Sequence, residues 1–433
     1  MKKLRFLSII AFILMSFFLV SCSLPTNDDM YYAPDTSEGY FGSDYKGGSV
    51  SPSSPDSSFE DAMTGEPGAT DEIISDNQGP LPGQITAAAW SDHKNYDFWC
   101  SLFKSDQENN KGLFSDFFTN LNAYNTTINT QKMITVKITD NQIPAINLPV
   151  TIKNDSYTFS ALTNVSGIAY LFLPIDASFP YTIEYNNSSY ELSEYTNETI
   201  ELSTSLPQTK PNDYGLDLMF VIDTTGSMGD ELSYLKSEVK DVIESIDTKN
   251  DIRLSLLFYR DEGDQYVTRF FDFTTNIDEQ IANINNQRSS GGGDFPEAVD
   301  VALDLAINQA TWNEYSNKIL IHVLDAPPHN SKQNINLFAS SILTASKKGI
   351  RIIPVASSGI DKWTEFLLRT EALITGGTYT YITNHSGIGG NHIDATVESV
   401  TVEYLNDMLV RLINQYYTGV ETEPIPFDQI QKQ

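Results

Sequence analysis

The stretch LDLMFVID, residues 216–223, followed at once by TTGSMGDEL, residues 224–232, decides the fold of this 433-residue chain. Its first half is a continuous apolar run, which is typical of a parallel strand buried on both faces. Its second half contains two glycines, which are typical of a tight loop. Apolar side chains then recur at helical spacing from Leu232 to Ile246. The stretch therefore predicts a buried strand, a tight loop and a helix.

The same alternation of strand and helix continues downstream. Further strands are predicted at IRLSLLFY, VTRFFDF, KILIHVLD and IRIIPVA, with helices near residues 277–286, 296–307, 334–348, 363–375 and 405–416. Such alternation predicts an α/β fold, a doubly wound and mostly parallel sheet with helices on both faces. In this architecture the ligand site lies at the carboxyl ends of the strands.

The loop after the first strand carries the chemistry. Asp223 ends the strand, and Thr225 and Ser227 follow at two-residue steps. A phosphate loop would need a Lys beside its Ser or Thr, and a nucleophile elbow would need Gly-x-Ser-x-Gly, so the loop fits neither. One carboxylate with two hydroxyls suits a hard divalent cation that prefers oxygen ligands. We therefore expect a site for Mg²⁺, or for Ca²⁺ or Mn²⁺.

The run Asp223-Thr224-Thr225-Gly226-Ser227 resembles the Asp-x-Ser/Thr-x-Ser signature of von Willebrand factor type A (VWA) domains, which have a Rossmann-like fold. The resemblance covers residues 212–420. It implies a metal-ion-dependent adhesion site (MIDAS) in which Asp223, Thr225 and Ser227 bind the metal directly or through water. It also implies that Asp325, at the end of a later strand, joins them. In that family the metal keeps one position open for an acidic group on a partner.

The middle loop, SSGGGDFPEA at residues 289–298, lacks the Thr that the family usually supplies there. With YRDEGD at 259–264 and DAPPH at 325–329, it resembles the branch found in hemicentins, alpha-kinase-linked proteins and many bacterial surface proteins. That resemblance implies that Asp294 takes the place of the Thr as a metal ligand. The alternative is that Asp294 caps a helix starting near Pro296, with Glu297 three residues on. One residue can do both.

Other polar residues have weaker claims on the site. Asp261 and Asp264 form either a second cation site or a support for their own loop, and we favour the support. The five His residues show no zinc spacing. His322 lies within a strand and is expected in the core, whereas His329 is close enough in sequence to Asp325 to line the metal pocket.

The N-terminus indicates the compartment. Three basic residues precede the apolar run 6–20, which is the pattern of a secretory signal. The run ends at Leu19-Val20-Ser21-Cys22, which resembles a bacterial lipobox and implies a signal peptide at 1–21 and acylation of Cys22. No later stretch is long enough to cross a bilayer. We expect a lipid-anchored protein of the bacterial cell envelope, on the outer membrane or cell surface, in which Cys100 has no disulfide partner.

Composition divides the chain before the VWA region. Residues 22–82 are rich in Ser, Pro, Gly, Asp and Glu and predict a flexible acidic tether, and 83–130 predict an aromatic-rich segment that packs on a neighbour. Period-two alternation over 131–205 predicts a small antiparallel β-sandwich, and 421–433 form a tail. Because the metal motifs all follow residue 213, the fragment 205–420 is expected to fold and bind a cation alone.

Net charge limits the partners. At −30, with a pI near 4.3, the chain supplies no basic stripe for nucleic acid. Two classes of function remain: a metal-dependent protein-binding or adhesion protein, and a metal-assisted hydrolase with Asp264 or His329 as its base. A purely structural cation is a third possibility. The hydroxyl-rich site favours binding of a protein ligand through an acidic side chain, so we expect no enzyme.

Overall fold

The computed structural model describes residues 85–104, 112–205, 214–248, 252–384 and 394–429. The predicted signal peptide 1–21, the acylation site Cys22 and the tether up to residue 82 lie outside the described residues, as do His385 and His392. Along the described ranges, no helix combines the length and apolarity that a membrane span needs.

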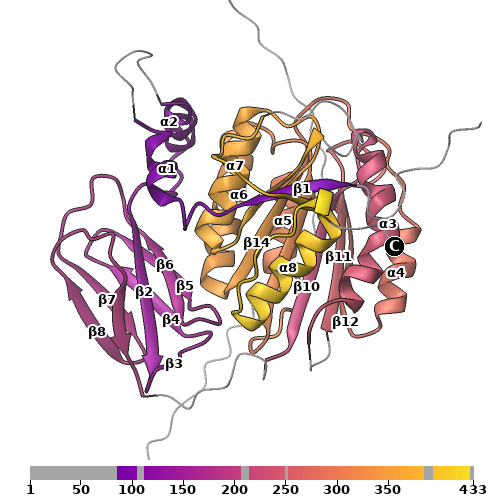
Figure 1. Ribbon diagram of the computed structural model, residues 1–433. Helices are drawn as coiled ribbons and strands as arrows, with labels where there is room; N and C mark the ends of the chain where they lie inside the picture. The colour runs from indigo at the N-terminus through magenta and orange to yellow at the C-terminus, as the bar shows by residue number, and fades with distance from the viewer. Residues whose placement is uncertain (1–84, 105–111, 206–213, 249–251, 385–393, 430–433) are drawn as a thin grey trace, which may run out of the picture. The chain divides into compact units, whose positions relative to one another are not determined.

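The main sheet has eight strands in the order β12-β11-β10-β13-β14-β15-β1-β16 (Figure 1). The strands β10, β11, β13, β14 and β15 are parallel to one another, and β12 joins the edge antiparallel to β11. This confirms the predicted α/β fold with a mostly parallel sheet. The bounds are Leu216–Asp223 for β10, Ile252–Tyr259 for β11, Thr268–Thr274 for β12, Asn317–Leu324 for β13, Ile350–Ala356 for β14 and Tyr379–Ile382 for β15.

Both faces of the sheet are covered, as the sequence of β10 requires. All eight of its residues are buried, and successive side chains enter different apolar clusters. Leu218 and Phe220 pack in the cluster with α3 and α8, whereas Met219 and Val221 pack in the cluster with α5, α6 and α7. The helices are α3 Gly229–Glu244, α4 Ile277–Asn285, α5 Val299–Asn308, α6 Lys332–Lys348, α7 Lys362–Thr375 and α8 Leu405–Thr418.

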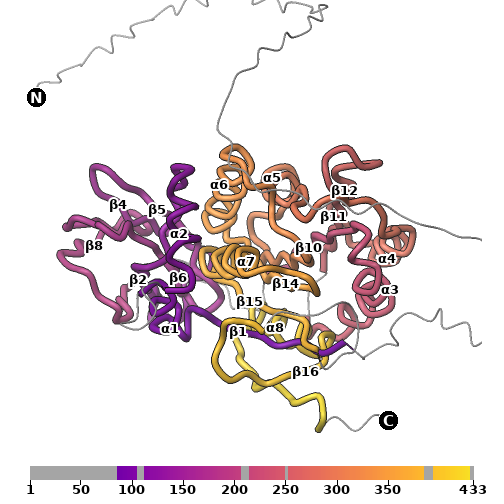
Figure 2. Tube along the Cα trace, turned by 90° about the horizontal axis from the view of Figure 1, so that it is seen from above, coloured from indigo at the N-terminus to yellow at the C-terminus, as the bar shows by residue number. Residues whose placement is uncertain are grey.

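A strand from far upstream completes the sheet. β1, Thr86–Trp90, lies between β15 and β16, Val402–Tyr404, and is antiparallel to both, with Ala88 opposite Tyr381 and Val402. Figure 2 shows this indigo strand among the yellow C-terminal elements. The prediction that residues 83–130 only pack on a neighbour does not account for β1. The short run TAAAW has no pattern that reveals partners almost three hundred residues away.

The rest of that aromatic segment packs against α7. It forms α1, Tyr96–Ser101, and α2, Ser115–Ala123. Trp99 and Phe114 lie 6.3 and 5.4 Å, centroid to centroid, from the ring of Phe366. Arg369 of α7 is buried, pairs with Asp92 through two hydrogen bonds and lies over the Trp99 ring. Because a buried charge is tolerated only when paired, this contact fixes the segment firmly to α7.

The β-sandwich consists of two four-stranded sheets. One has the order β3-β2-β6 with β9 beside β2, and the other has the order β5-β4-β7-β8. All pairs are antiparallel except β2 with β9. The strands are β2 Met133–Asp140, β3 Ile143–Pro144, β4 Pro149–Lys153, β5 Thr158–Leu162, β6 Ile168–Phe172, β7 Tyr181–Tyr185, β8 Ser188–Leu192 and β9 Ile200–Ser203. Arg351 of β14 donates a hydrogen bond of 3.0 Å to the carbonyl of Leu162 in β5. This bond links the main sheet to the β-sandwich.

The position of β1 changes what is expected of the fragment 205–420. Without residues 85–104, β15 and β16 lose the strand that joins them, and α7 loses its aromatic cover. We expect this fragment to melt at least about 10 °C below the fragment 85–429, as measured by circular dichroism. Ala88→Pro in the longer fragment keeps the sandwich but disrupts β1, because Pro cannot donate to a ladder. This substitution should lower the melting temperature as well. Equal melting temperatures of the fragment 205–420, the fragment 85–429 and its Ala88→Pro variant would contradict this role of β1.

Candidate metal centre

Asp223 lies at the carboxyl end of β10, where the sequence placed it. Its carboxylate is fully buried, and both the N–H and the hydroxyl of Thr225 donate to Oδ1, at 2.8 and 2.7 Å. The hydroxyls of Thr225 and Ser227 lie 3.4 Å apart. Oδ2 of Asp223 makes no hydrogen bond to any described residue. One carboxylate oxygen is therefore held by the loop and the other is left for a ligand.

Asp325 reaches the same place from the neighbouring strand. β13 is parallel to β10, so its carboxyl end lies at the same edge of the sheet, and Asp325 is the first residue after it. The Ser227 side chain hydrogen-bonds the Asp325 carboxylate. Burial, together with the negative charge of Asp325, raises the pKa of Asp223 to about 8, and burial raises the pKa of Asp325 as well. The structure thus brings Asp223, Thr225, Ser227 and Asp325 together.

Glu297 is a buried carboxylate that the sequence analysis considered only as part of a helix start. A Cβ on Gly292 would lie 2.8 Å from Oε1 of Glu297 and 3.3 Å from Cβ of Thr225, so Glu297 and Thr225 flank this glycine. Burial, and then the charges of Asp223, Asp261 and Asp325, raise the pKa of Glu297 to about 9. Its Oε2 has no hydrogen-bond partner among the described residues.

Asp294 does not cap α5. The helix begins at Val299, its N-cap is Ala298, and no side chain makes a capping hydrogen bond there. The reason is that the Glu297 N–H donates to the Pro327 carbonyl, in a bridge with the loop after β13, which delays the first helical turn. The capping alternative is therefore wrong. Asp294 is exposed and contributes to raising the pKa of His329, so it lies on the His329 side of the centre.

Asp264 supports its own loop, as we favoured, because its Oδ2 accepts the N–H of Asp261 at 3.3 Å. It also supports the glycine loop, which the sequence analysis did not predict. Its Oδ2 accepts the N–H of Gly292 at 2.8 Å, and a Cβ on Gly291 would clash with its carboxylate. Gly291 also has a φ of +85°, so the position suits glycine on both grounds. This contact fixes the loop that carries Asp294 and Glu297.

His329 lies beside Asp261, with 2.7 Å between Nε2 and Oδ1. Partial burial lowers the pKa of His329, but the hydrogen bond and charge of Asp261 outweigh it, and the pKa is raised. His322 is buried within β13, where its Nδ1 lies 3.0 Å from Oε1 of Glu371 on α7, in agreement with the predicted core position.

The donor set fits a divalent cation of the oxygen-preferring kind. Buried oxygens of Asp223 and Glu297 have no hydrogen-bond partner in the described part of the chain, and burial together with the neighbouring negative charges raises the pKa of both carboxylates. No described group of three or more His, Cys, Asp or Glu residues has the arrangement of a metal site. Here carboxylates instead combine with the hydroxyls of Thr225 and Ser227, which is the chemistry that Mg²⁺, Ca²⁺ and Mn²⁺ accept.

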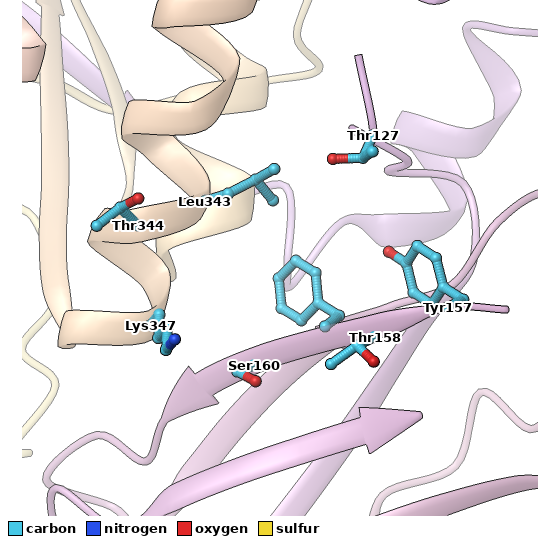
Figure 3. A pocket seen from close by; sticks show the side chains of 8 residues that line it. Thr127, Tyr157, Thr158, Ser160, Leu343, Thr344 and Lys347 are labelled. Carbon is cyan, nitrogen blue, oxygen red and sulfur yellow. The ribbon is translucent and has the colours of Figure 1, made fainter. Parts of the chain in front are cut away.

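A separate cavity of about 250 Å³ lies between α6 and β5. In Figure 3, Thr344 and Lys347 lie on α6 and Thr158 and Ser160 lie on β5, and all four line the cavity. Its lining has hydroxyls and one ammonium but no carboxylate. Lys347 stands in the last turn of α6, which precedes the amino end of β14, so this cavity is not part of the candidate metal centre.

Residues 217–388 match the family model of the von Willebrand factor A domain. All the predicted metal-site residues fall within this match. The match supports a VWA domain in this part of the chain.

Two curated proteins are similar to the chain. It is 27% identical over 223 residues to the ariadne-like RING finger protein R811 of Acanthamoeba polyphaga mimivirus, covering 48% of this chain and 21% of that protein. It is 31% identical over 121 residues to alpha-protein kinase vwkA of Dictyostelium discoideum, covering 27% of this chain and 19% of that protein. The chain thus spans about a fifth of the length of each relative.

Two solved structures are more distant. BatB, a conserved hypothetical protein from Bacteroides thetaiotaomicron, is 14% identical with a TM-score of 0.32, covering 39% of this chain and 92% of that chain. An aerotolerance-related membrane protein from Bacteroides fragilis NCTC 9343 is 15% identical with a TM-score of 0.32, covering 48% and 100%. The fold assignment rests on the sheet topology and the family match.

The raised pKa values predict how stability depends on pH when no divalent cation is present. Protonated Asp223 and Glu297 stabilise the folded state, fully so below their unfolded pKa values of 3.8 and 4.5. This stabilisation is lost as the pH rises through about 8 and about 9. With chelator present, the free energy of unfolding in urea should fall by about 2 kcal/mol or more between about pH 5 and about pH 9.

Saturating Mg²⁺ should reduce this fall, because the cation takes the place of the protons. Asp223→Asn and Glu297→Gln together should flatten the pH profile in chelator. A wild-type stability that rises with pH over this range would contradict the assignment.

Proposed function

We propose that this protein binds a divalent cation through Asp223, Thr225, Ser227 and Asp325 and uses it to hold a protein partner. The observation that carries the proposal is the buried Oδ2 of Asp223, which has no hydrogen bond among the described residues and lies beside two hydroxyls and a second carboxylate. The cation is Mg²⁺, or Ca²⁺ or Mn²⁺, and when bound it attracts an oxygen of an acidic side chain on the partner. The site would then act as a MIDAS.

The loops prepare the site before any ligand arrives. Thr225 holds one oxygen of Asp223 with two hydrogen bonds and so fixes the direction of the other. Ser227 is exposed although Asp223 is fully buried, so one side of the centre faces solvent. This opening supports a partner-binding site over a purely structural cation, whose ligands would be expected to close around it.

Binding is favoured over catalysis by the state of the two candidate bases. Asp264 already accepts hydrogen bonds from two backbone N–H groups, those of Asp261 and Gly292. His329 is paired with Asp261, which orients it and is the one observation that favours the alternative, a metal-assisted hydrolase. That alternative requires cation-dependent ester or phosphoester hydrolysis that His329→Gln abolishes.

We place the protein at the bacterial cell envelope, where Cys22 carries the lipid anchor. The lipobox-like Leu19 to Cys22 supports this placement. The charge of −30 argues for a protein partner and against nucleic acid.

The function is tested by titrating the full chain with Mg²⁺, Ca²⁺ and Mn²⁺ in a calorimeter. Asp223→Asn should lower cation affinity by about a hundredfold, because it removes the best-placed charged ligand. A pull-down from envelope extract should retain partners only without chelator, and Asp223→Asn should retain none. If the chain binds the cation normally but retains its partners equally well with chelator, the cation has only a structural role.

The same titration separates the roles of Asp294 and Glu297. If Asp294 is a ligand, Asp294→Thr loosens the cation by about tenfold, and Glu297→Gln serves as the matched loss of one carboxylate from the same loop. If Asp294→Thr keeps the wild-type affinity for the cation and Glu297→Gln lowers it, then Glu297 and not Asp294 is the metal ligand.

Lipid anchoring predicts a separate result. Wild-type chain expressed in bacteria should incorporate labelled fatty acid and partition with membranes, and Cys22→Ala should do neither, because the acylated thiol is gone. Cys100→Ala is the matched control and should behave as wild type. Label on Cys22→Ala would show that the anchor lies elsewhere.

A further inference from the structure

Four cationic residues lie close together in this strongly acidic chain, and two of them, Arg260 and Arg269, lie over the ring of Tyr266. Lys236 belongs to α3, Arg260 follows β11, Arg269 belongs to β12 and Arg288 follows α4. We call these four residues the basic cluster. They come from four different elements, so the fold and not the local sequence brings them together.

Contacts around one turn hold the basic cluster in place. The guanidinium carbons of Arg260 and Arg269 lie 4.5 and 4.1 Å from the Tyr266 ring centroid. Arg269 donates to Oε1 of Gln287 at 2.8 Å, and Lys236 donates to the Gln287 carbonyl at 2.5 Å. Arg260 also donates to the carbonyl of residue 288 at 2.6 Å. The charges of Lys236, Arg260 and Arg269 are therefore positioned before any partner arrives, and the exposed Arg288 lies beside them.

None of the four makes an ion pair with a described carboxylate. Arg260 is buried, and its hydrogen bonds to backbone carbonyls stabilise the surrounding loops. Arg288 is exposed, and Lys236 and Arg269 are half-buried. Burial, and then the charge of Arg288, lower the pKa of Lys236, so the charges of Lys236 and Arg288 repel one another. Lys236, Arg269 and Arg288 therefore remain available to an acidic partner.

The basic cluster lies directly beside the metal loop. The Tyr266 hydroxyl is 2.8 Å from Oγ1 of Thr224, the residue between Asp223 and Thr225. The Thr224 carbonyl accepts hydrogen bonds from Nε of Arg260 at 3.2 Å and from the Ser290 N–H at 3.0 Å. A partner that reaches the metal centre therefore also comes within reach of these cations.

We propose that the basic cluster is a second part of the partner-binding surface and binds further carboxylates of an acidic protein segment. This inference rests on the proposed function, in which the first acidic group of that segment reaches the cation. Guanidinium groups pair with carboxylates through two parallel hydrogen bonds, so Arg269 and Arg288 suit Asp and Glu side chains. The partner is a segment with several acidic residues, not one isolated carboxylate.

The basic cluster also offsets a charge problem at the metal centre. Asp223, Asp325 and the neighbouring Glu297 are three carboxylates close to one divalent cation, and together they leave a net negative charge that repels an incoming carboxylate. Three accessible cations beside it reverse the sign of the local field for a ligand that covers both places. The surface then selects a ligand by the number and spacing of its acidic groups.

The test uses the full chain with saturating Mg²⁺ and a fluorescent peptide of about eight residues in which Asp and Gly alternate, with an Asn–Gly peptide as its neutral match. Anisotropy should show at least about tenfold tighter binding of the Asp peptide. Arg269→Gln and Arg288→Gln should each weaken it about two- to fivefold and lessen its salt dependence. Lys347 is an exposed cation in the last turn of α6, and Lys347→Gln serves as the control. It should leave the affinity for the Asp peptide unchanged.

The outcomes separate this inference from the proposed function. If Asp-peptide binding is lost with chelator and in Asp223→Asn but is unchanged in Arg269→Gln, in Arg288→Gln and in the variant that combines these two substitutions, the basic cluster has no role and the proposed function stands. If the chain binds no cation, the proposed function fails. Equal binding of the Asp and Asn peptides, or tighter binding of a single-stranded oligonucleotide than of the Asp peptide, would overturn the acidic-segment inference.

Discussion

The half-satisfied carboxylate of Asp223 is the constraint on which the rest of the centre depends. Its Oδ1 accepts two hydrogen bonds from Thr225, whereas its Oδ2 has none among the described residues, at a position without solvent exposure. A buried, unpaired carboxylate oxygen is costly unless it is protonated or binds a cation. The raised pKa of Asp223, about 8, corresponds to protonation when no cation is bound. The surrounding hydroxyls and carboxylates make cation binding possible instead.

The sheet supplies the geometry that this carboxylate needs. β10 is flanked by β11 and β13, both parallel to it, so the loops after all three strands meet at one edge. Asp264, in the loop after β11, holds the glycine loop, and Asp325 follows β13 directly. Because helices cover both faces of β10, Asp223 at its end is buried, whereas Ser227 in the following loop is exposed. The chemistry thus follows from strand order.

The sequence predicted what depends on local pattern and missed what depends on distant contacts. The strand at 216–223 and its loop were predictable because apolar periodicity and the Asp-x-Thr-x-Ser spacing are contained in a dozen residues. β1 was not, because its five residues become a strand only between β15 and β16. The helix start near Pro296 was placed three residues too early, since Glu297 bonds to the loop after β13. The same contact buries Glu297, which no local pattern could indicate.

The overall charge of the chain and the charge around the site act over different distances. A net charge of −30 should repel an acidic partner, yet at physiological ionic strength charges more than about 8 Å away are largely screened. The approach is therefore governed by groups next to the metal loop, where the basic cluster lies and where the described residues supply it no ion-paired carboxylate. In the proposed function the cation must bind first, because it offsets most of the negative charge of the carboxylates at the metal centre and so allows the basic cluster to attract an incoming acidic segment. Metal dependence and selection of the partner would then be two consequences of one local charge distribution.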